Sequence, residues 1–326
     1  MAGAGNAPLI VEVKRHSHED GPGIRSVVFF KGCPLRCRFC HNPETQDPRP
    51  EVAFTASACL QCGQCRSACP AGAIALDRAG RIRRDRCRRC GACARACPGK
   101  ALRLVGTPWP VETLVELLLR DLPYYRHSGG GVTLSGGECT LYPNYLAALL
   151  QRLKDAGVHV TLETCGQFEY ESFEQNVLPG LDLIYYDIKC AASDDHQRLT
   201  GRRNDRILEN LRRLIARKQP PVVVRTPLVP GLTATPENLS ALVDILSRIG
   251  VRELTLLPYN PMGLEMYEKL GRPQPNLPQR FMTAEEENEV RKVFERLLLR
   301  SRPRFDSSVH EELDHLFLTA QGEGRA

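Results

Sequence analysis

The 326-residue sequence contains no apolar run that approaches the roughly 18 residues needed to cross a membrane. Its first segment, Met1–Asp20, lacks an apolar core followed by a cleavage-like site, so we expect no secretory signal peptide. Strong charge of one sign is also missing, because the net charge is only +6, and nucleic acid is therefore not favoured as the main partner. The sequence predicts a globular protein of the cytoplasm without a membrane partner.

Cysteine, in contrast, is abundant: the chain has 14, and 11 of them fall into three tight groups. A secreted chain with an even number would suggest disulfide bonds, but a reducing cytoplasm keeps thiols free. Cysteines two or three residues apart also suit a shared metal centre better than a bridge. We therefore interpret the three groups as metal sites. The remaining Cys139, Cys165 and Cys190 are interpreted as small buried hydrophobic residues.

Short β-rich segments alternate with helical patterns from Arg25 onward, which predicts a parallel sheet. The predicted strands carry few charges, as strands buried on both faces do. They cover Arg25–Lys31, Gly131–Ser135, Val158–Glu163, Asp182–Asp187, Pro221–Leu228 and Arg252–Leu257, and the helices cover Val111–Asp121, Pro143–Ala156, Arg206–Lys218 and Pro236–Ile249. Six such units predict an α/β fold, a partial (β/α)6 barrel of the TIM type.

Residues 52–104 interrupt this alternation with eight cysteines and few strong hydrophobes. We interpret them as a small inserted domain held together by metal, since the segment could hardly bury a core alone. Residues 1–51 and 105–326 would then form the barrel. After the last strand, the polar segment Pro258–Arg280 could frame the barrel mouth, and Thr283 and Glu286 stand at capping-box spacing for a further helix.

The insertion contains the pattern C-x2-C-x2-C-x3-C-P twice, which is the two-cluster arrangement of bacterial ferredoxins. In that arrangement the fourth cysteine of each run binds the other cluster. The predicted [4Fe–4S] ligands are therefore Cys59, Cys62, Cys65 and Cys97 for one cluster, and Cys87, Cys90, Cys93 and Cys69 for the other. Zinc is the alternative metal for these cysteines.

The third group, Cys33, Cys37 and Cys40, follows the first predicted strand in the segment KGCPLRCRFCHN. Three thiolates within eight residues can hold three irons of a [4Fe–4S] cluster and leave the fourth iron without a protein ligand. An open iron is useful only if a substrate binds it, and the amino and carboxylate groups of S-adenosylmethionine (SAM) can do so. The alternative is a zinc site with His41 as fourth ligand, because structural zinc takes a closed tetrahedron.

This C-x3-C-x2-C loop, with Phe39 before its last cysteine, resembles the signature of the radical SAM superfamily. The run DGPGIR at residues 20–25, continuing as VVFFKGCPLRC, is similar to one subfamily, the activating enzymes of glycyl-radical enzymes. The resemblance covers nearly the whole chain. It implies an oxidoreductase with three [4Fe–4S] clusters, in which Cys33, Cys37, Cys40 and Lys189 are catalytic.

The resemblance also implies the contacts of SAM. The segment Ser135–Glu138 would cradle the amino group of SAM, because glycines let a backbone approach a ligand closely. Glu163, Thr164 and Asp187 could hold a monovalent cation, since oxygen ligands suit a hard cation. The implied contacts are Phe39, Cys40, His41, Gly136, Gly137, Glu138, Thr164, Asp187, Ile188, Lys189, Arg225 and Asn260.

Two of these contacts have alternatives. An ordinary ion pair would also explain Asp187 and Lys189 at a strand end. At Asn260 the sequence departs from relatives that resemble pyruvate formate-lyase activase, which have histidine there, although asparagine can still donate and accept hydrogen bonds.

The reaction that the resemblance implies is reductive cleavage of SAM to a 5′-deoxyadenosyl radical, which takes a hydrogen from a glycine of a partner enzyme. A radical SAM enzyme acting on a small molecule or peptide would share the cluster motifs but not the DGPGIR-to-KGCPLRC opening. A non-catalytic electron-transfer protein would explain the eight inserted cysteines but not the three-cysteine loop. The insertion argues against pyruvate formate-lyase as the partner, because its activase type lacks these two clusters.

A reductant is the second expected partner. Arginines crowd around the second ferredoxin run, where an acidic flavodoxin or ferredoxin could dock by electrostatic steering. They are Arg81, Arg83, Arg84, Arg86, Arg88, Arg89 and Arg95. A basic face that is merely solvated is the alternative interpretation.

Overall fold

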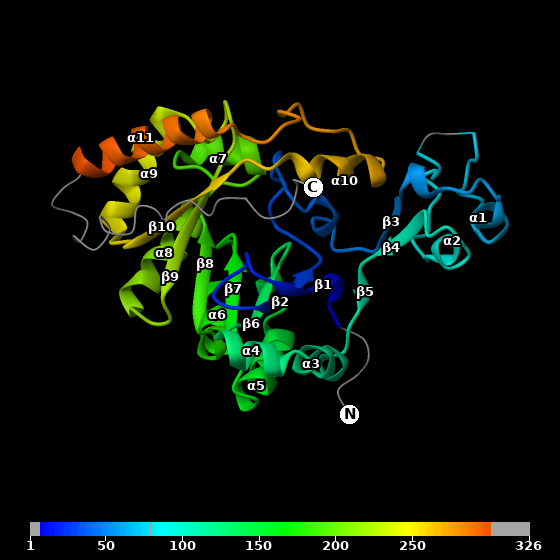
Figure 1. Cartoon of the computed structure of the whole chain (residues 1–326), viewed down its shortest axis with the longest axis horizontal. Coiled ribbons are helices and arrows are strands. Elements are labelled where there is room, and N and C mark those ends of the chain that lie inside the picture. Colours follow the sequence, from blue (N-terminus) through cyan, green and yellow to red (C-terminus); the bar gives the residue numbers. More distant parts are fainter. Residues whose placement is uncertain (1–6, 78–79, 301–326) are drawn as a thin grey trace.

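The computed structural model describes residues 7–77 and 80–300 of the chain. The main body is built on one open sheet of eight strands in the order β10-β9-β8-β7-β6-β2-β1-β5 (Figure 1). These strands are β1 (Leu9–Ser17), β2 (Arg25–Phe30), β5 (Thr107–Pro108), β6 (Gly131–Gly136), β7 (His159–Thr164), β8 (Leu183–Asp187), β9 (Val222–Leu228) and β10 (Glu253–Pro258). A second, two-stranded sheet pairs β3 (Glu51–Phe54) with β4 (Leu102–Val105).

Strands β2 and β6 to β10 lie parallel to one another and follow chain order across the sheet. The six predicted strands are therefore confirmed, each end agreeing to within one residue. Residues in the middle of these strands, such as Val27, Val132 and Ile184, are fully buried. Burial on both faces explains why the strands appear in the sequence as continuous apolar runs.

Helices connect successive parallel strands, and the four predicted ones are confirmed as α3 (Val111–Leu119), α5 (Pro143–Asp155), α8 (Asp205–Arg217) and α9 (Pro236–Ile249). The capping box before α11 (Ala284–Arg300) is also formed: Thr283 N donates to Glu286 Oε2 (2.8 Å), and Glu286 N donates to Thr283 Oγ1 (3.2 Å). Outside the insertion, four shorter helices of the described residues were not predicted, namely α4 (Leu122–Ser128), α6 (Tyr170–Asn176), α7 (Ser193–Thr200) and α10 (Leu264–Lys269). Within the described ranges, no helix combines the length and apolarity that a membrane span requires.

Strand β1 extends the sheet beyond β2 by antiparallel pairing and was not predicted either. It is fixed by Asp121, which follows α3 and is nearly completely buried. Asp121 accepts hydrogen bonds from Arg15 of β1 (2.8 Å to Nε) and from Ser26 of β2 (2.7 Å). One carboxylate thus ties two strands to the helical layer.

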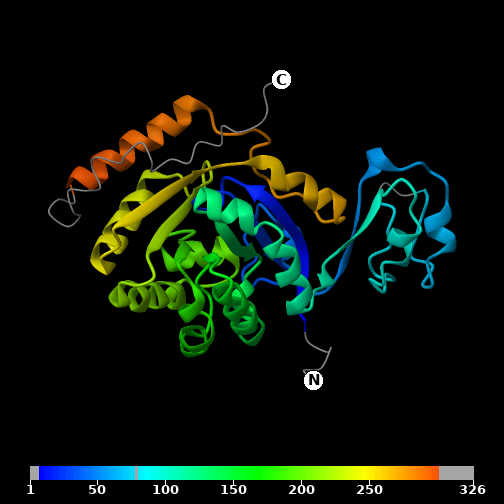
Figure 2. The ribbon, with the colours of Figure 1, turned by 60° about the horizontal axis from the view of Figure 1, so that its bottom comes forward.

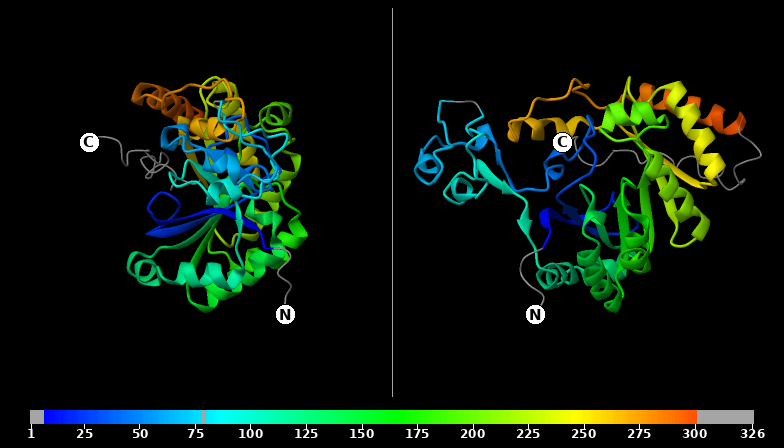
Figure 3. Two further views of the ribbon diagram at one scale, coloured as in Figure 1. Left: turned by 90° about the vertical axis from the view of Figure 1, so that its right-hand side faces the viewer. Right: turned by 180° about the vertical axis from the view of Figure 1, so that it is seen from behind.

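The segment from β3 to β4 forms a smaller part that projects from one side of the sheet (Figures 2 and 3). It carries the short helices α1 (Gln64–Ser67) and α2 (Ala92–Arg95). Glu51 pairs with Val105, so the chain leaves and rejoins the main body at adjacent positions. This part has a small core of its own, in which Phe54, Ile74 and Ile82 pack together with several cysteines.

Candidate active site

The three-cysteine loop lies at the carboxyl end of β2 and is held by backbone hydrogen bonds from two sides. Cys33 N donates to Gln46 O (3.2 Å), and Arg36 N donates to Thr200 O at the end of α7 (2.7 Å). All cysteines in the structure are free thiols. Burial raises the pKa of Cys37, and it raises the pKa of Cys40 to about 12, so both need a bound metal to become thiolates at neutral pH.

The alternative of a zinc site at the three-cysteine loop requires a fourth ligand. Structural zinc needs four ligands at about 2.0 to 2.3 Å from a single point. Among residues 7–77 and 80–300, no three Cys, His, Asp or Glu side chains converge in a way that could hold one metal ion. His41, the suggested zinc ligand, is instead hydrogen-bonded to the side chain of Asn260.

The glycines of the Ser135–Glu138 segment pack against the start of the three-cysteine loop. Gly137 N donates to Phe30 O (2.8 Å), and Glu138 N donates to Gly32 O (2.7 Å). A Cβ atom on Gly136 would lie 2.3 Å from Phe30 N, and Gly136 has φ +106°, which favours glycine. Glycine is therefore required at this position by close packing against β2.

Glu138 is completely buried and holds the loop after β7. Its carboxylate accepts hydrogen bonds from Thr140 Oγ1 (2.6 Å), Thr164 Oγ1 (2.9 Å) and Cys165 N (2.8 Å). The Cys165 side chain is in turn hydrogen-bonded to Cys33, which lowers the pKa of Cys33. Cys165 is thus buried, as predicted, but it also touches a cysteine of the three-cysteine loop, a contact that the sequence analysis missed.

Four ionised side chains form a network at the carboxyl ends of β7, β8 and β9. Arg225 Nη1 lies 2.7 Å from Glu163 Oε1, and Arg225 Nε lies 3.0 Å from Asp187 Oδ1. Lys189 Nζ lies 2.7 Å from Asp187 Oδ2. Arg225 lies between the two carboxylates that, with Thr164, were predicted to hold a monovalent cation, and the Thr164 hydroxyl is hydrogen-bonded to Glu138.

Asp187, Lys189 and Arg225 of this network stay ionised at neutral pH. Burial opposes the charge of Asp187, but Lys189 and Arg225 outweigh burial and lower its pKa. Burial likewise opposes the charges of Lys189 and Arg225, but the carboxylates raise the pKa of both. Two cations and two anions beside the three-cysteine loop suit a zwitterion, because the methionine part of SAM carries one carboxylate and one ammonium group.

The other predicted SAM contacts lie around the same loop. Phe39 packs against the main apolar core, and Ile188 is buried and donates its N–H to Arg225 O (2.9 Å). Asn260 accepts a hydrogen bond from Met262 N (2.8 Å) and contacts His41. Residues predicted from separate motifs are thus brought together at one edge of the sheet.

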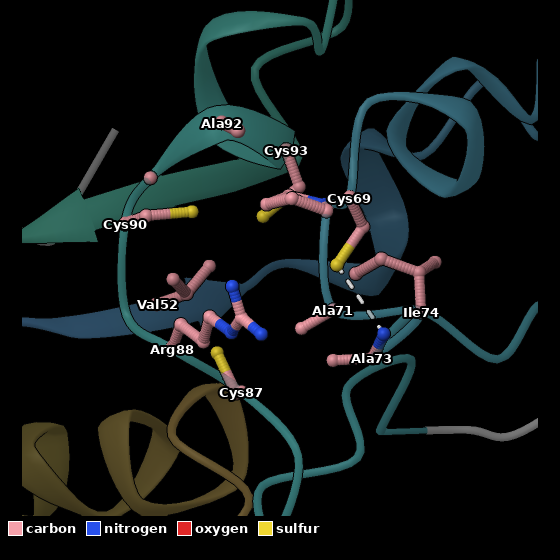
Figure 4. Close-up of a pocket in the computed structure, with 12 residues that line it drawn as sticks. Val52, Cys69, Ala71, Ala73, Ile74, Cys87, Arg88, Cys90, Ala92 and Cys93 are labelled. Atoms are coloured by element: carbon pink, nitrogen blue, oxygen red, sulfur yellow. Dashed lines mark hydrogen bonds between the residues drawn. The ribbon is translucent and has the colours of Figure 1, made fainter.

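The eight inserted cysteines line two separate hollows, each partly open to solvent. One encloses about 310 Å³ and is lined by Cys69, Cys87, Cys90 and Cys93 (Figure 4). The other encloses about 370 Å³ and is lined by Cys59, Cys62, Cys65 and Cys97. Each hollow contains the four thiols that the ferredoxin spacing assigns to a single cluster. We call the first the near hollow, because it is lined by Val52 near the start of β3, and the second the far hollow, because it is lined by Phe54 at the end of β3.

Known proteins share this architecture. The chain is 38% identical over 293 residues to the trans-4-hydroxy-L-proline dehydratase activating enzyme of Clostridioides difficile, covering 88% of this chain and 96% of that one. It is 39% identical to the choline trimethylamine-lyase activating enzyme of Oleidesulfovibrio alaskensis, over 81% of this chain and 87% of that one. The chain belongs to the glycyl-radical enzyme activating enzymes.

Family models locate the parts of this activating enzyme. The radical SAM superfamily model matches residues 84–243, the 4Fe-4S dicluster domain matches 51–102, and the 4Fe-4S single cluster domain matches 19–68. SAM and iron–sulfur clusters are therefore its cofactors. The structure of Streptococcus suis SuiB bound to precursor peptide SuiA shares the fold, with a TM-score of 0.51, 14% identity, and coverage of 84% of this chain and 46% of that one.

Proposed function

We propose that this activating enzyme is an oxidoreductase that generates a glycyl radical on a partner enzyme. Bound SAM and its cluster supply one-electron cleavage of the sulfonium to methionine and a 5′-deoxyadenosyl radical, which takes a hydrogen atom from the partner glycine. The observation that carries the proposal is the balanced network of Glu163, Asp187, Lys189 and Arg225 beside the three free thiols of the loop.

The side chains of this edge would bind and orient SAM. Lys189 and Arg225 can take its carboxylate, while Glu163 and Asp187 can take its ammonium group. Cys33, Cys37 and Cys40 would hold the SAM-binding cluster, and the near and far hollows would hold two further clusters, three in all. Together with Thr164, the same two carboxylates could also hold a monovalent cation beside the carboxylate of SAM.

The two hollows support an electron relay from a flavodoxin or ferredoxin to the three-cysteine loop.

The partner enzyme belongs to the glycyl-radical class, but relatives with similar identity activate different members. An isethionate sulfite-lyase activating enzyme of Oleidesulfovibrio alaskensis is 41% identical, and an indoleacetate decarboxylase activating enzyme of Tractidigestivibacter scatoligenes is 36% identical. Overall identity therefore does not select among them.

The test is to incubate anaerobically reconstituted, dithionite-reduced protein with SAM, alone and with a panel of glycyl-radical enzymes. We expect 5′-deoxyadenosine in every sample and a glycyl signal in electron paramagnetic resonance (EPR) with the correct partner. Cys37→Ala should abolish both, whereas Cys190→Ala, at a buried cysteine outside the three groups whose thiol donates to Asn238 Oδ1 (3.3 Å), should retain both. A fully iron-loaded parent that makes no 5′-deoxyadenosine would refute the proposal.

A further inference from the structure

Gln46 is a buried residue that contacts every cysteine of the three-cysteine loop. Its main-chain oxygen accepts from Cys33 N (3.2 Å), and its Nε2 donates to Cys37 O (3.4 Å). Its side chain also lies close enough to the thiol of Cys40 to lower the pKa of that thiol, although burial dominates and raises it. The position of Gln46 is therefore fixed to the position of the loop.

Asp47, the next residue, connects this point to the insertion. Its carboxylate accepts hydrogen bonds from Arg49 (2.9 Å to Nη2) and from Arg89 (3.1 Å to Nη1). Burial opposes the ionisation of Asp47, but these arginines outweigh burial and hold its pKa well below its usual range. The pair with Arg89 is thus charged on both sides and only partly exposed, which favours a charge-assisted hydrogen bond.

Arg89 lies between two cysteines of the near hollow. Its main-chain N–H donates to Cys87 Sγ (3.4 Å), while its guanidinium reaches Asp47. Its φ of 57° lies in the left-handed region that residues other than glycine rarely adopt. A continuous series of contacts therefore links the three-cysteine loop to Cys87: Gln46 is hydrogen-bonded to the loop, Asp47 follows it in the chain, and Arg89 binds Asp47 through its side chain and Cys87 through its main-chain N–H.

A second connection runs beside the first. Fully buried Lys31, two residues before Cys33, lies 2.8 Å from Glu51 Oε2 at the start of β3. Val52, the next residue of β3, lines the near hollow and accepts a hydrogen bond at its carbonyl from Arg84, which also bonds Lys269 O of α10. Helix α10 lies beside Cys87 in Figure 4. In contrast, the far hollow is lined by Leu60, whose surface is 68% exposed.

We propose that Gln46, Asp47 and Arg89 form a bridge that fixes the near hollow against the three-cysteine loop and makes it the immediate electron donor to that loop. The inference rests on the proposed function. One electron leaves the cluster of the near hollow, which is oxidised by one unit, and arrives at the cluster of the loop, which is reduced by one unit. No proton moves, and a one-electron donor of the flavodoxin or ferredoxin class restores the first cluster.

The test compares Asp47→Asn and Arg89→Gln with Arg49→Gln in the full-length protein carrying reconstituted clusters. Arg49 is the matched control, because it also binds Asp47 but lies on the surface and belongs to neither cysteine run. Freeze-quenched EPR would follow reduction of the SAM-bound cluster by a ferredoxin, and hydrogen exchange would report backbone protection at residues 45–49. Since small displacements of a reacting pair are costly, we expect both bridge variants to transfer electrons about tenfold more slowly, with faster exchange. Arg49→Gln should keep the parent rate.

Rescue and iron content make the outcome decisive. Arg89→Lys keeps the charge and should recover most of the rate. If Arg89→Gln binds less iron than the parent, its slower transfer could reflect a missing cluster. Asp47→Asn then provides the test of the bridge, because Asp47 lies outside both ferredoxin runs. If Asp47→Asn with a full iron content keeps the parent rate of electron transfer and the parent rate of hydrogen exchange, the proposed bridge is wrong. A dithionite-reduced parent that does not cleave SAM would instead overturn the proposed function, which these transfer rates do not measure.

Discussion

Arg225 joins the ends of three neighbouring strands through one side chain. From β9 it reaches Glu163 on β7 and Asp187 on β8, and all three residues are close to fully buried. A planar guanidinium can serve two carboxylates at once, which a lysine ammonium cannot do with the same geometry. The shape of this predicted SAM site therefore depends on the identity of one arginine.

Replacing Arg225 with methionine should destabilise the fold by about 3–5 kcal/mol, because two buried carboxylates lose their shared partner. Urea unfolding would measure the loss, and equilibrium binding should show weaker SAM affinity. Arg203→Met is the matched control: Arg203 also bridges two carboxylates, Asp194 and Asp205, but at the surface. It should cost no more than about 1 kcal/mol. Equal losses in the two variants would contradict the role of burial.

The elements that sequence reasoning found are those with long apolar patterns. Strand β6 and helix α5 repeat buried residues over enough positions to be recognised, whereas α7 has the polar sequence SDDHQRLT and only eight residues. Strand β1 was missed because its second half carries the consecutive exposed residues Lys14, Arg15 and His16, which interrupt the apolar run.

The candidate site shows the same division. Motifs identified Glu163, Asp187 and Lys189, since residues at the carboxyl ends of adjacent parallel strands must meet. The pairing of Arg225 with both carboxylates, and of Cys165 with Cys33, depends on side-chain rotamers of residues distant in sequence. The spacing of motifs in the sequence cannot predict these side-chain contacts.

At the same scale, Asp121 gives the junction of β1, β2 and α3 a defined pH dependence. The hydrogen bond from Arg15 lowers the pKa of Asp121 below that of the unfolded chain, so the carboxylate stabilises the fold above about pH 4. This contribution is lost as the pH falls through the lower, folded pKa. Asp121→Asn should therefore cost about 1–3 kcal/mol at neutral pH, and the difference from the parent should narrow below about pH 4.

Chemical denaturation followed by circular dichroism across this pH range would test the expectation. Asp155→Asn, at an exposed position bonded to Gln151, is the control and should leave stability nearly unchanged at each pH. A difference between Asp121→Asn and the parent that grows on acidification would contradict the assigned sign.

For the whole molecule, six of the seven arginines around the second ferredoxin run divide into two sets. Arg81, Arg84 and Arg89 are turned toward Cys59, the carbonyl of Val52 and Asp47, respectively, so their charges serve the insertion itself. Three others stay exposed and could meet an acidic reductant, namely Arg86, Arg88 and Arg95.

If these exposed arginines steer a flavodoxin or ferredoxin, the rate of reduction should fall steeply with ionic strength. Replacing all three by glutamine should slow reduction about tenfold at low salt. The control is a charge-matched triple replacement of Arg202, Arg206 and Arg212, which are exposed on the main body. Stopped-flow measurement of reduction at several salt concentrations would separate the two, and a flat salt response in the parent would rule out steering.

The pairing of Glu51 with Val105 has a consequence for how such a protein can arise. The chain enters and leaves the insertion at paired residues of β3 and β4. A single genetic insertion or deletion at this point would therefore add or remove the two cysteine-lined hollows without changing the strand order of the main sheet. The ion pair between Lys31 and Glu51 lies at this junction, so it would attach an inserted segment to the main body at the point where the two join. The insertion, which would carry electrons, and the main body, which would generate the radical, can therefore be gained or lost separately.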